Sequence, residues 1–124
     1  MSIKITFIGA GNMANSLAGG LVAKGYAHGD ITLTDISEQL LKKRKNDLGI
    51  NTNTDNVSAC SLADIVVLAV KPQVTQAVVA PLKPIIKERA PLVISIAAGL
   101  TIGNLEECLG KNTAIVRCMP NTPA

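Results

Sequence analysis

Short runs of apolar residues alternate along the chain with stretches in which apolar residues recur at helical spacing. The runs predict strands at residues 3–8, 31–34, 50–53, 64–70, 92–96 and 114–118. The stretches between them predict helices over residues 12–24, between Ser37 and Gly49, over 57–62, over 73–88 with interruptions at Pro81 and Pro84, and over 101–109. Strands and helices therefore alternate along the whole sequence.

Strands that are apolar on both faces and separated by helices are typical of a parallel sheet covered on both sides. The connections between parallel strands are right-handed almost without exception. We therefore predict an α/β fold, namely a doubly wound parallel sheet of the Rossmann type, with about six strands and helices on both faces.

The turn from the first strand into the first helix reads FIGAGNMA, residues 7–14. Gly9, Gly11 and Ala14 match the pattern G-x-G-x-x-A. The first glycine allows a tight turn, the second lets a pyrophosphate approach the backbone, and the alanine lets the helix pack close to the sheet. Free amides and the positive end of the helix dipole favour phosphate groups. This turn predicts a dinucleotide site, for NADPH or NADH.

Asp35, at the end of the second predicted strand, bears on the choice between these cofactors. It follows Gly11 by 24 positions, near the spacing of about 20 that is typical of such sites. Its carboxylate can accept hydrogen bonds from the adenosine ribose, which favours NADH, and repels a 2′-phosphate unless it points away. The basic run at residues 42–45 could attract that phosphate, although we interpret it as a solvated helix face. Ser37 fits a helix cap better than a phosphate ligand.

The carboxyl ends of the fourth and fifth predicted strands belong to the same edge of the sheet, where ligands of such folds bind. Small residues in AVKP, 69–72, and AAG, 97–99, let a flat ring lie against the backbone. Lys71 is either a partner for a substrate carboxylate or phosphate, or a solvent lysine. Cys118 and Met119 are interpreted as core residues. We find no catalytic triad, carboxylate pair or nucleophile, so no catalytic residue is assigned.

Composition narrows the function classes further. The net charge of +3 is small, and only 2% of the residues are aromatic, too few for a base-stacking platform. We therefore expect no nucleic-acid partner. The longest strongly apolar run, 65–70, is too short to span a membrane. His28 is expected at the surface, and three widely spaced cysteines match no metal motif. We therefore expect no metal, and a cytoplasmic protein whose thiols, those of Cys60, Cys108 and Cys118, are buried.

Four segments, FIGAGNMA, DIVVLAVKPQ, SIAAGLTI and VRCMPNTPA, together resemble the amino-terminal half of pyrroline-5-carboxylate reductase. The resemblance extends from end to end, and the last three segments are the specific ones. It implies a dinucleotide-binding domain at residues 1–124 and a helical domain beyond it, which in this family forms an intertwined dimer and much of the substrate pocket. We therefore expect a fragment with little activity of its own, from a protein that is a homo-oligomer.

The resemblance also implies the reaction, a hydride transfer from NAD(P)H to the C=N carbon of 1-pyrroline-5-carboxylate that gives proline. It places the cofactor against Gly9, Ala10, Gly11, Asn12, Met13, Asn56, the backbone of Ala69, Val70, Lys71 and Pro72, and the backbone of Ala97, Ala98 and Gly99. Asn121 and Thr122 would lie near the nicotinamide and the substrate. Family members often have serine or arginine near Asp35–Ile36, so the departure here leaves the choice between NADH and NADPH open.

Two other functions fit part of the same pattern. A related imine or β-hydroxyacid reductase would share the glycine turn but not VRCMPNTPA. A non-catalytic NAD(P)-sensing protein could share the whole domain, and the helical half would tell it from an enzyme. If the chain exposes an apolar face where that half docks, we expect it to self-associate.

Overall fold

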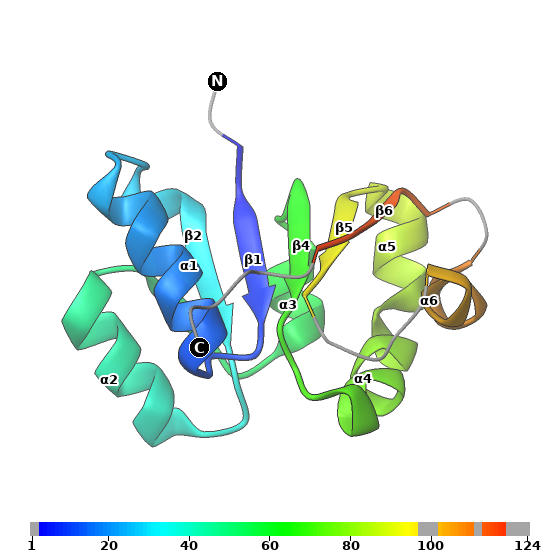
Figure 1. Cartoon of the computed structure of the whole chain (residues 1–124), viewed down its shortest axis with the longest axis horizontal. Helices are drawn as coiled ribbons and strands as arrows, with labels where there is room; N and C mark the ends of the chain where they lie inside the picture. Colours follow the sequence, from blue (N-terminus) through cyan, green and yellow to red (C-terminus); the bar gives the residue numbers. More distant parts are fainter. Residues whose placement is uncertain (1–2, 97–101, 111–112, 119–124) are drawn as a thin grey trace.

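The structure is a computed structural model that describes residues 3–96, 102–110 and 113–118 (Figure 1). Its strands are β1 (Ile5–Ile8), β2 (Ile31–Thr34), β3 (Asn51–Asn53), β4 (Ile65–Leu68), β5 (Leu92–Ser95) and β6 (Ile115–Arg117). All neighbouring pairs are parallel, and the order across the sheet is β3-β2-β1-β4-β5-β6. This confirms the doubly wound parallel sheet. The strand order reverses between β1 and β4, so their carboxyl ends form the switch point at which such sheets bind ligands.

The helices are α1 (Asn12–Ala23), α2 (Glu38–Leu48), α3 (Asn56–Cys60), α4 (Pro72–Val79), α5 (Lys83–Arg89) and α6 (Ile102–Leu109). There are also two short 3₁₀ turns: η1 (His28–Asp30) precedes β2, and η2 (Ala80–Leu82) joins α4 to α5. Each predicted helix exists, and its ends differ by a few residues from the prediction. The η1 turn was not predicted, because a single turn has no periodicity to detect.

The two prolines divide the predicted helix over 73–88 as the sequence indicated. Pro81 lies in η2, and Pro84 lies in the first turn of α5. Proline has no backbone N–H to donate, so it is tolerated in a first turn and interrupts a helix elsewhere. The chain therefore runs α4, η2 and α5 instead of one long helix.

Side chains of the sheet divide into two cores, one on each face. Phe7, Leu33 and Val67 pack with the buried alanines of α1 and with Leu41 of α2. Ile8, Leu68 and Val93 pack on the opposite face with α3, α4, α5, η2 and α6. Neighbours such as Phe7 and Ile8 belong to different cores because successive residues of a strand point to opposite faces. The prediction of helices on both faces is confirmed.

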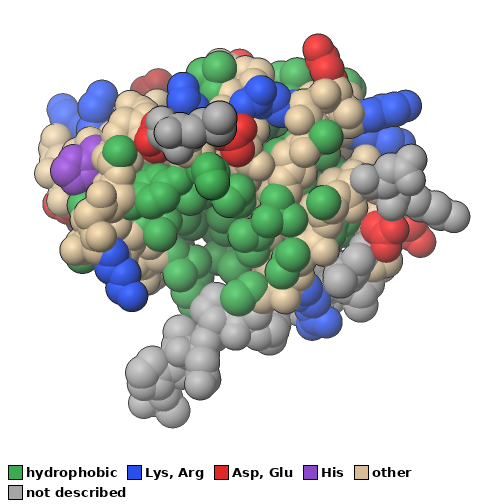
Figure 2. Space-filling view, turned by 90° about the horizontal axis from the view of Figure 1, so that it is seen from above, with side chains coloured by type: hydrophobic (Ala, Val, Ile, Leu, Met, Phe, Trp, Pro, Cys, Tyr) green, Lys and Arg blue, Asp and Glu red, His purple; other side chains and the backbone are tan. Residues whose placement is uncertain are grey.

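One of the two sheet faces is only partly covered by its helices. Beside α1, the strands β4 and β5 line an open apolar depression with Ile65, Val67, Ile94 and Ile96. Figure 2 shows hydrophobic side chains gathered around a hollow near the middle of the molecule. No described helix covers this depression, and Val116 of the edge strand β6 is 47% exposed.

Candidate functional site

The glycine turn joins β1 to α1 at the switch point, beside the end of β4. Gly9 has φ +104°, a conformation that side-chain-bearing residues rarely adopt. A Cβ at this position would lie 2.8 Å from the carbonyl oxygen of Ala69. The structure thus brings together two segments predicted from distant parts of the sequence. Glycine is required here both for the backbone conformation and for the close approach of the β4 loop.

Gly11 differs from Gly9 in both respects. It is the N-cap of α1, with φ −71° and ψ −169°, a conformation open to any residue. A Cβ there would meet no atom within 4 Å. The space beside Gly11 is therefore free in the folded chain, as the close approach of a ligand would require.

The N-terminus of α1 has no side-chain cap and no acidic residue in its first turn. The Asn15 N–H, which donates to the Gly11 carbonyl, begins the helical hydrogen bonds. By contrast, Ser37 caps α2 and Asp55 caps α3 through side-chain oxygens. The uncapped amides and the dipole of α1 therefore face the carboxyl edge of the sheet with their capacity for an anion still available.

Asp35 lies just beyond β2, as predicted, and its carboxylate contacts the glycine turn directly. Its Oδ2 accepts a hydrogen bond from the Ala10 N–H at 3.1 Å, and its Oδ1 accepts one from the Ser37 N–H at 3.0 Å. Asp35 is half-buried, whereas Ile36 beside it is 94% exposed. The carboxylate therefore holds the turn and the start of α2 together.

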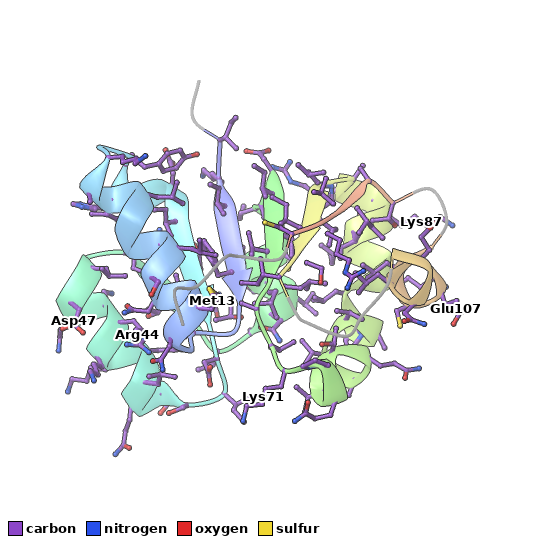
Figure 3. The ribbon with its side chains drawn as sticks, in the orientation of Figure 1. Met13, Arg44, Asp47, Lys71, Lys87 and Glu107 are labelled. Carbon is purple, nitrogen blue, oxygen red and sulfur yellow. The ribbon has the colours of Figure 1, made fainter. Side chains whose placement is uncertain are left out.

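Arg44 corrects our interpretation of residues 42–45 as a solvated helix face. Three lysines of this run are exposed, but the Arg44 side chain is only 6% exposed. Its Nε donates to the carbonyl oxygen of Ala10 at 2.9 Å. Figure 3 shows it on the side of α2 that faces α1. The sequence held a signal for this position, because Arg44 follows the buried Leu41 by three residues and therefore shares its helix face.

The other predicted site residues lie at the same edge where the structure describes them. Asn56 is the half-buried first residue of α3, next to its cap Asp55. Lys71 is exposed at the start of α4, in the loop after β4 (Figure 3), and Pro72 is the first residue of that helix. Ala97, Ala98, Gly99, Asn121 and Thr122 lie outside the described residues.

The cysteines only partly follow the expectation of buried thiols. Cys60 is buried, and this burial raises the pKa of its thiol to about 12, so it stays protonated at neutral pH. Cys108 is half-buried, and Cys118 is exposed, which corrects its assignment to the core. The open sheet face beside β6 explains the exposure. Within the described ranges, no group of three or more His, Cys, Asp or Glu side chains could hold a metal ion.

Two further features concern the surface. His28 is exposed, as predicted, in the η1 turn that precedes β2. Every helix in the part of the chain that the structure describes is too short or too polar to cross a membrane.

A parallel sheet with a glycine turn and an uncapped helix N-terminus at its switch point is an α/β domain of the Rossmann type. A family model described as NADP oxidoreductase, coenzyme F420-dependent, matches residues 4–99, and the chain belongs to this family.

Relatives over nearly the whole chain have a more specific name. A protein of Vibrio alginolyticus named pyrroline-5-carboxylate reductase is 47% identical over 121 residues, which are 98% of this chain and 44% of the relative.

Two solved structures of reductases with this or a similar name also superpose on the chain. A pyrroline-5-carboxylate reductase of Coxiella burnetii superposes with a TM-score of 0.95 at 46% identity, over 99% of this chain and 46% of that one. The Plasmodium falciparum enzyme, solved with NADP bound, gives 0.84 at 34% identity, over 98% and 43%. This chain therefore spans somewhat less than half the length of these relatives.

Proposed function

We propose that the chain supplies the cofactor-binding domain of an NAD(P)H-dependent reductase that converts 1-pyrroline-5-carboxylate to L-proline. The observation that carries the proposal is the uncapped N-terminus of α1, with open space beside Gly11 at the switch point. The relatives named pyrroline-5-carboxylate reductase, one of them with NADP bound, support the choice of cofactor and reaction.

The described edge of the sheet fits a dinucleotide. We assign the pyrophosphate to the turn of Gly9, Ala10, Gly11, Asn12 and Met13, whose helix amides lack a side-chain acceptor at the N-cap. The adenosine half would extend toward Asp35 and Asn56, and the nicotinamide half toward the backbone of Ala69, Val70, Lys71 and Pro72. Ala97, Ala98 and Gly99, with Asn121 and Thr122 nearest the substrate, complete the proposed site by resemblance.

The bound dinucleotide supplies a hydride for the C=N carbon of the substrate, whose protonated imine nitrogen makes that carbon more electrophilic. The task of this chain is orientation, because the reacting atoms must approach within about 3–3.5 Å in the correct geometry. The turn and the helix dipole would hold the phosphates. The close approach of Gly9 and Ala69 keeps the loops that follow β1 and β4 side by side. We assign no catalytic acid or base to this chain.

The proposal extends to the rest of the protein. The second half of the relatives' length would complete the substrate pocket and make the whole protein a homo-oligomer that works in the cytoplasm. It would require neither nucleic acid nor membrane as a partner.

A titration of the 124-residue chain with NADPH and, separately, with NADH tests the cofactor assignment through the fluorescence of the reduced nicotinamide. We expect saturable binding of at least one. A preference for NADH indicates that Asp35 also accepts from the ribose, and one for NADPH that basic or hydroxyl groups outweigh it. If a chain that is folded by circular dichroism binds neither, the assignment is wrong.

Oxidation of the preferred cofactor in the presence of 1-pyrroline-5-carboxylate tests the reaction. We expect turnover by the whole protein and little by this chain alone. Turnover by the chain at the rate of a full-length reductase would contradict our assignment of the substrate pocket to the second half. No turnover by a whole protein that binds the cofactor would contradict the substrate.

A further inference from the structure

Both backbone polar groups of Ala10 are held by side chains from the unit formed by β2 and α2. The Ala10 N–H donates to Asp35 Oδ2, and the Ala10 carbonyl accepts from Arg44 Nε. The Ala10 side chain is fully buried. The middle residue of the G-x-G turn is thus fixed on three sides, by two charged groups and by the core.

The bond to Arg44 determines the direction of the next amide. The peptide group between Ala10 and Gly11 is planar, and no described peptide bond is cis. In a trans peptide the carbonyl and the N–H point in opposite directions. Because Arg44 holds the Ala10 oxygen on the side of α2, the Gly11 N–H points away from α2, at an exposed residue beside open space.

The guanidinium of Arg44 is also suited to this position. It is permanently charged and has five N–H donors, and hydrogen bonds from charged donors are stronger than neutral ones. Its side chain is 94% buried between elements. An acceptor is therefore needed to offset the cost of burial, and the Ala10 carbonyl provides one.

We propose that Arg44 is a positioning residue for pyrophosphate binding, which aims the Gly11 amide at the phosphates of the dinucleotide by holding the Ala10 carbonyl. This inference rests on the proposed function, because it presupposes that the turn binds the pyrophosphate. Arg44 itself need not touch the cofactor. The effect of Arg44 on affinity is then the same for NADH and NADPH, because both contain the same pyrophosphate group and they differ only at the adenosine 2′ position.

Three variants separate this role from others. Arg44→Met keeps an unbranched stem about as long as that of arginine up to Nε but removes the guanidinium and its donors. Arg44→Lys keeps the charge and an ammonium group that can donate to the same carbonyl. Lys43→Met, at an exposed position of the same helix, removes an equal charge without touching the turn. Affinity for NADH and for NADPH is measured for each variant, together with its melting temperature.

We expect Arg44→Met to weaken both cofactors about tenfold, the effect of losing one well-placed hydrogen bond. Arg44→Lys should restore part of this loss, and Lys43→Met should bind like the unaltered chain. A loss confined to NADPH would overturn the proposal, because it would show a direct contact with the 2′-phosphate. A lower melting temperature with unchanged affinities would overturn it too, because the role would be structural only.

Hydrogen exchange of the Ala10 amide gives a readout without any ligand. In the unaltered chain this amide is bonded to Asp35 and should exchange slowly. Release of the carbonyl in Arg44→Met should let the turn move and speed this exchange, whereas Lys43→Met should not. Unchanged exchange in Arg44→Met would overturn this proposal, whether or not the chain binds a cofactor. Failure of the unaltered chain to bind either cofactor would instead count against the proposed function.

Discussion

At the scale of single residues, the two glycines of the turn have separate tasks. Gly9 has φ +104° and no room for a Cβ beside Ala69, so it belongs to the fold. Gly11 has an ordinary backbone conformation and free space beside it, so the fold does not require a glycine there, whereas the proposed pyrophosphate site does. Sequence matching treats both as members of one motif, and only their surroundings distinguish them.

A matched pair of substitutions tests this division. Gly11→Val should cost the free energy of unfolding less than about 1 kcal/mol, as at a replaced glycine N-cap. It should nevertheless weaken NADH and NADPH binding at least about tenfold, because the side chain fills the space of the pyrophosphate. Gly9→Val should destabilise the chain by about 2 kcal/mol or more, through backbone strain and the clash with Ala69. Thermal unfolding and nicotinamide fluorescence measure the two effects, and unchanged affinity in folded Gly11→Val would contradict the site.

At the scale of elements, the helices that begin at the carboxyl edge differ in how their first turns are satisfied. The Ser37 hydroxyl accepts from the Leu40 N–H at the start of α2, and Asp55 serves the same purpose for α3. At the start of α1 no side chain does so. The start of α4, at Lys71 and Pro72, also has no side-chain cap. Of these two uncapped helices, α1 is the one that follows the glycine turn, where we propose that the pyrophosphate binds.

Ser37→Ala should therefore lower the free energy of unfolding by about 1 kcal/mol, the usual cost of losing an N-cap. Ser16→Ala, at an exposed position inside α1, is the control, and it should be neutral or slightly stabilising because alanine favours helices. Chemical denaturation measures both. If Ser37→Ala is as stable as the unaltered chain, Ser37 is not needed as a cap, and a role at the phosphates would regain support.

At the scale of the whole molecule, the two faces of the sheet are unequally covered. The face toward α3, α4, α5 and α6 is packed, while β4 and β5 remain open beside α1. Val116 is the register partner of Ile94, so it points to the same open side. Open apolar faces of this kind favour association.

We expect the 124-residue chain to self-associate through this face, and sedimentation velocity across a concentration series would detect it. Val116→Lys should weaken the association about tenfold by placing a charge on the face. Val74→Lys is the control, since Val74 is similarly exposed, at 44%, but lies on α4 at the packed side. A monomer at all concentrations, or an equal effect of both substitutions, would contradict the prediction.

Local signals in the sequence were sufficient for much of this protein. The periodicity of the apolar residues, together with the glycine, proline and capping residues between the runs, predicted every strand and α-helix of the described residues. These signals can be detected in the sequence because they act over a few positions. Ser37 caps the start of α2 and Gly49 follows its end, as expected. Pro81 and Pro84 interrupt the helical stretch over 73–88, also as expected. The turn at Gly9 and the acid at Asp35 were also visible, since their spacing reflects one strand-helix-strand unit. Short elements such as η1 escaped because they have no period.

Other features depended on which segments meet in space. A run of basic residues reads as solvated, yet Arg44 lies inside because α2 packs beside the glycine turn and the Ala10 carbonyl accepts its hydrogen bond. An apolar strand end reads as core, yet Cys118 is exposed because no described helix covers that side of β6. The sequence alone therefore determined the elements, the fold class and the motif. The tertiary structure alone decided the partners of Asp35 and Arg44 and the open face, because these depend on contacts between residues far apart in the chain.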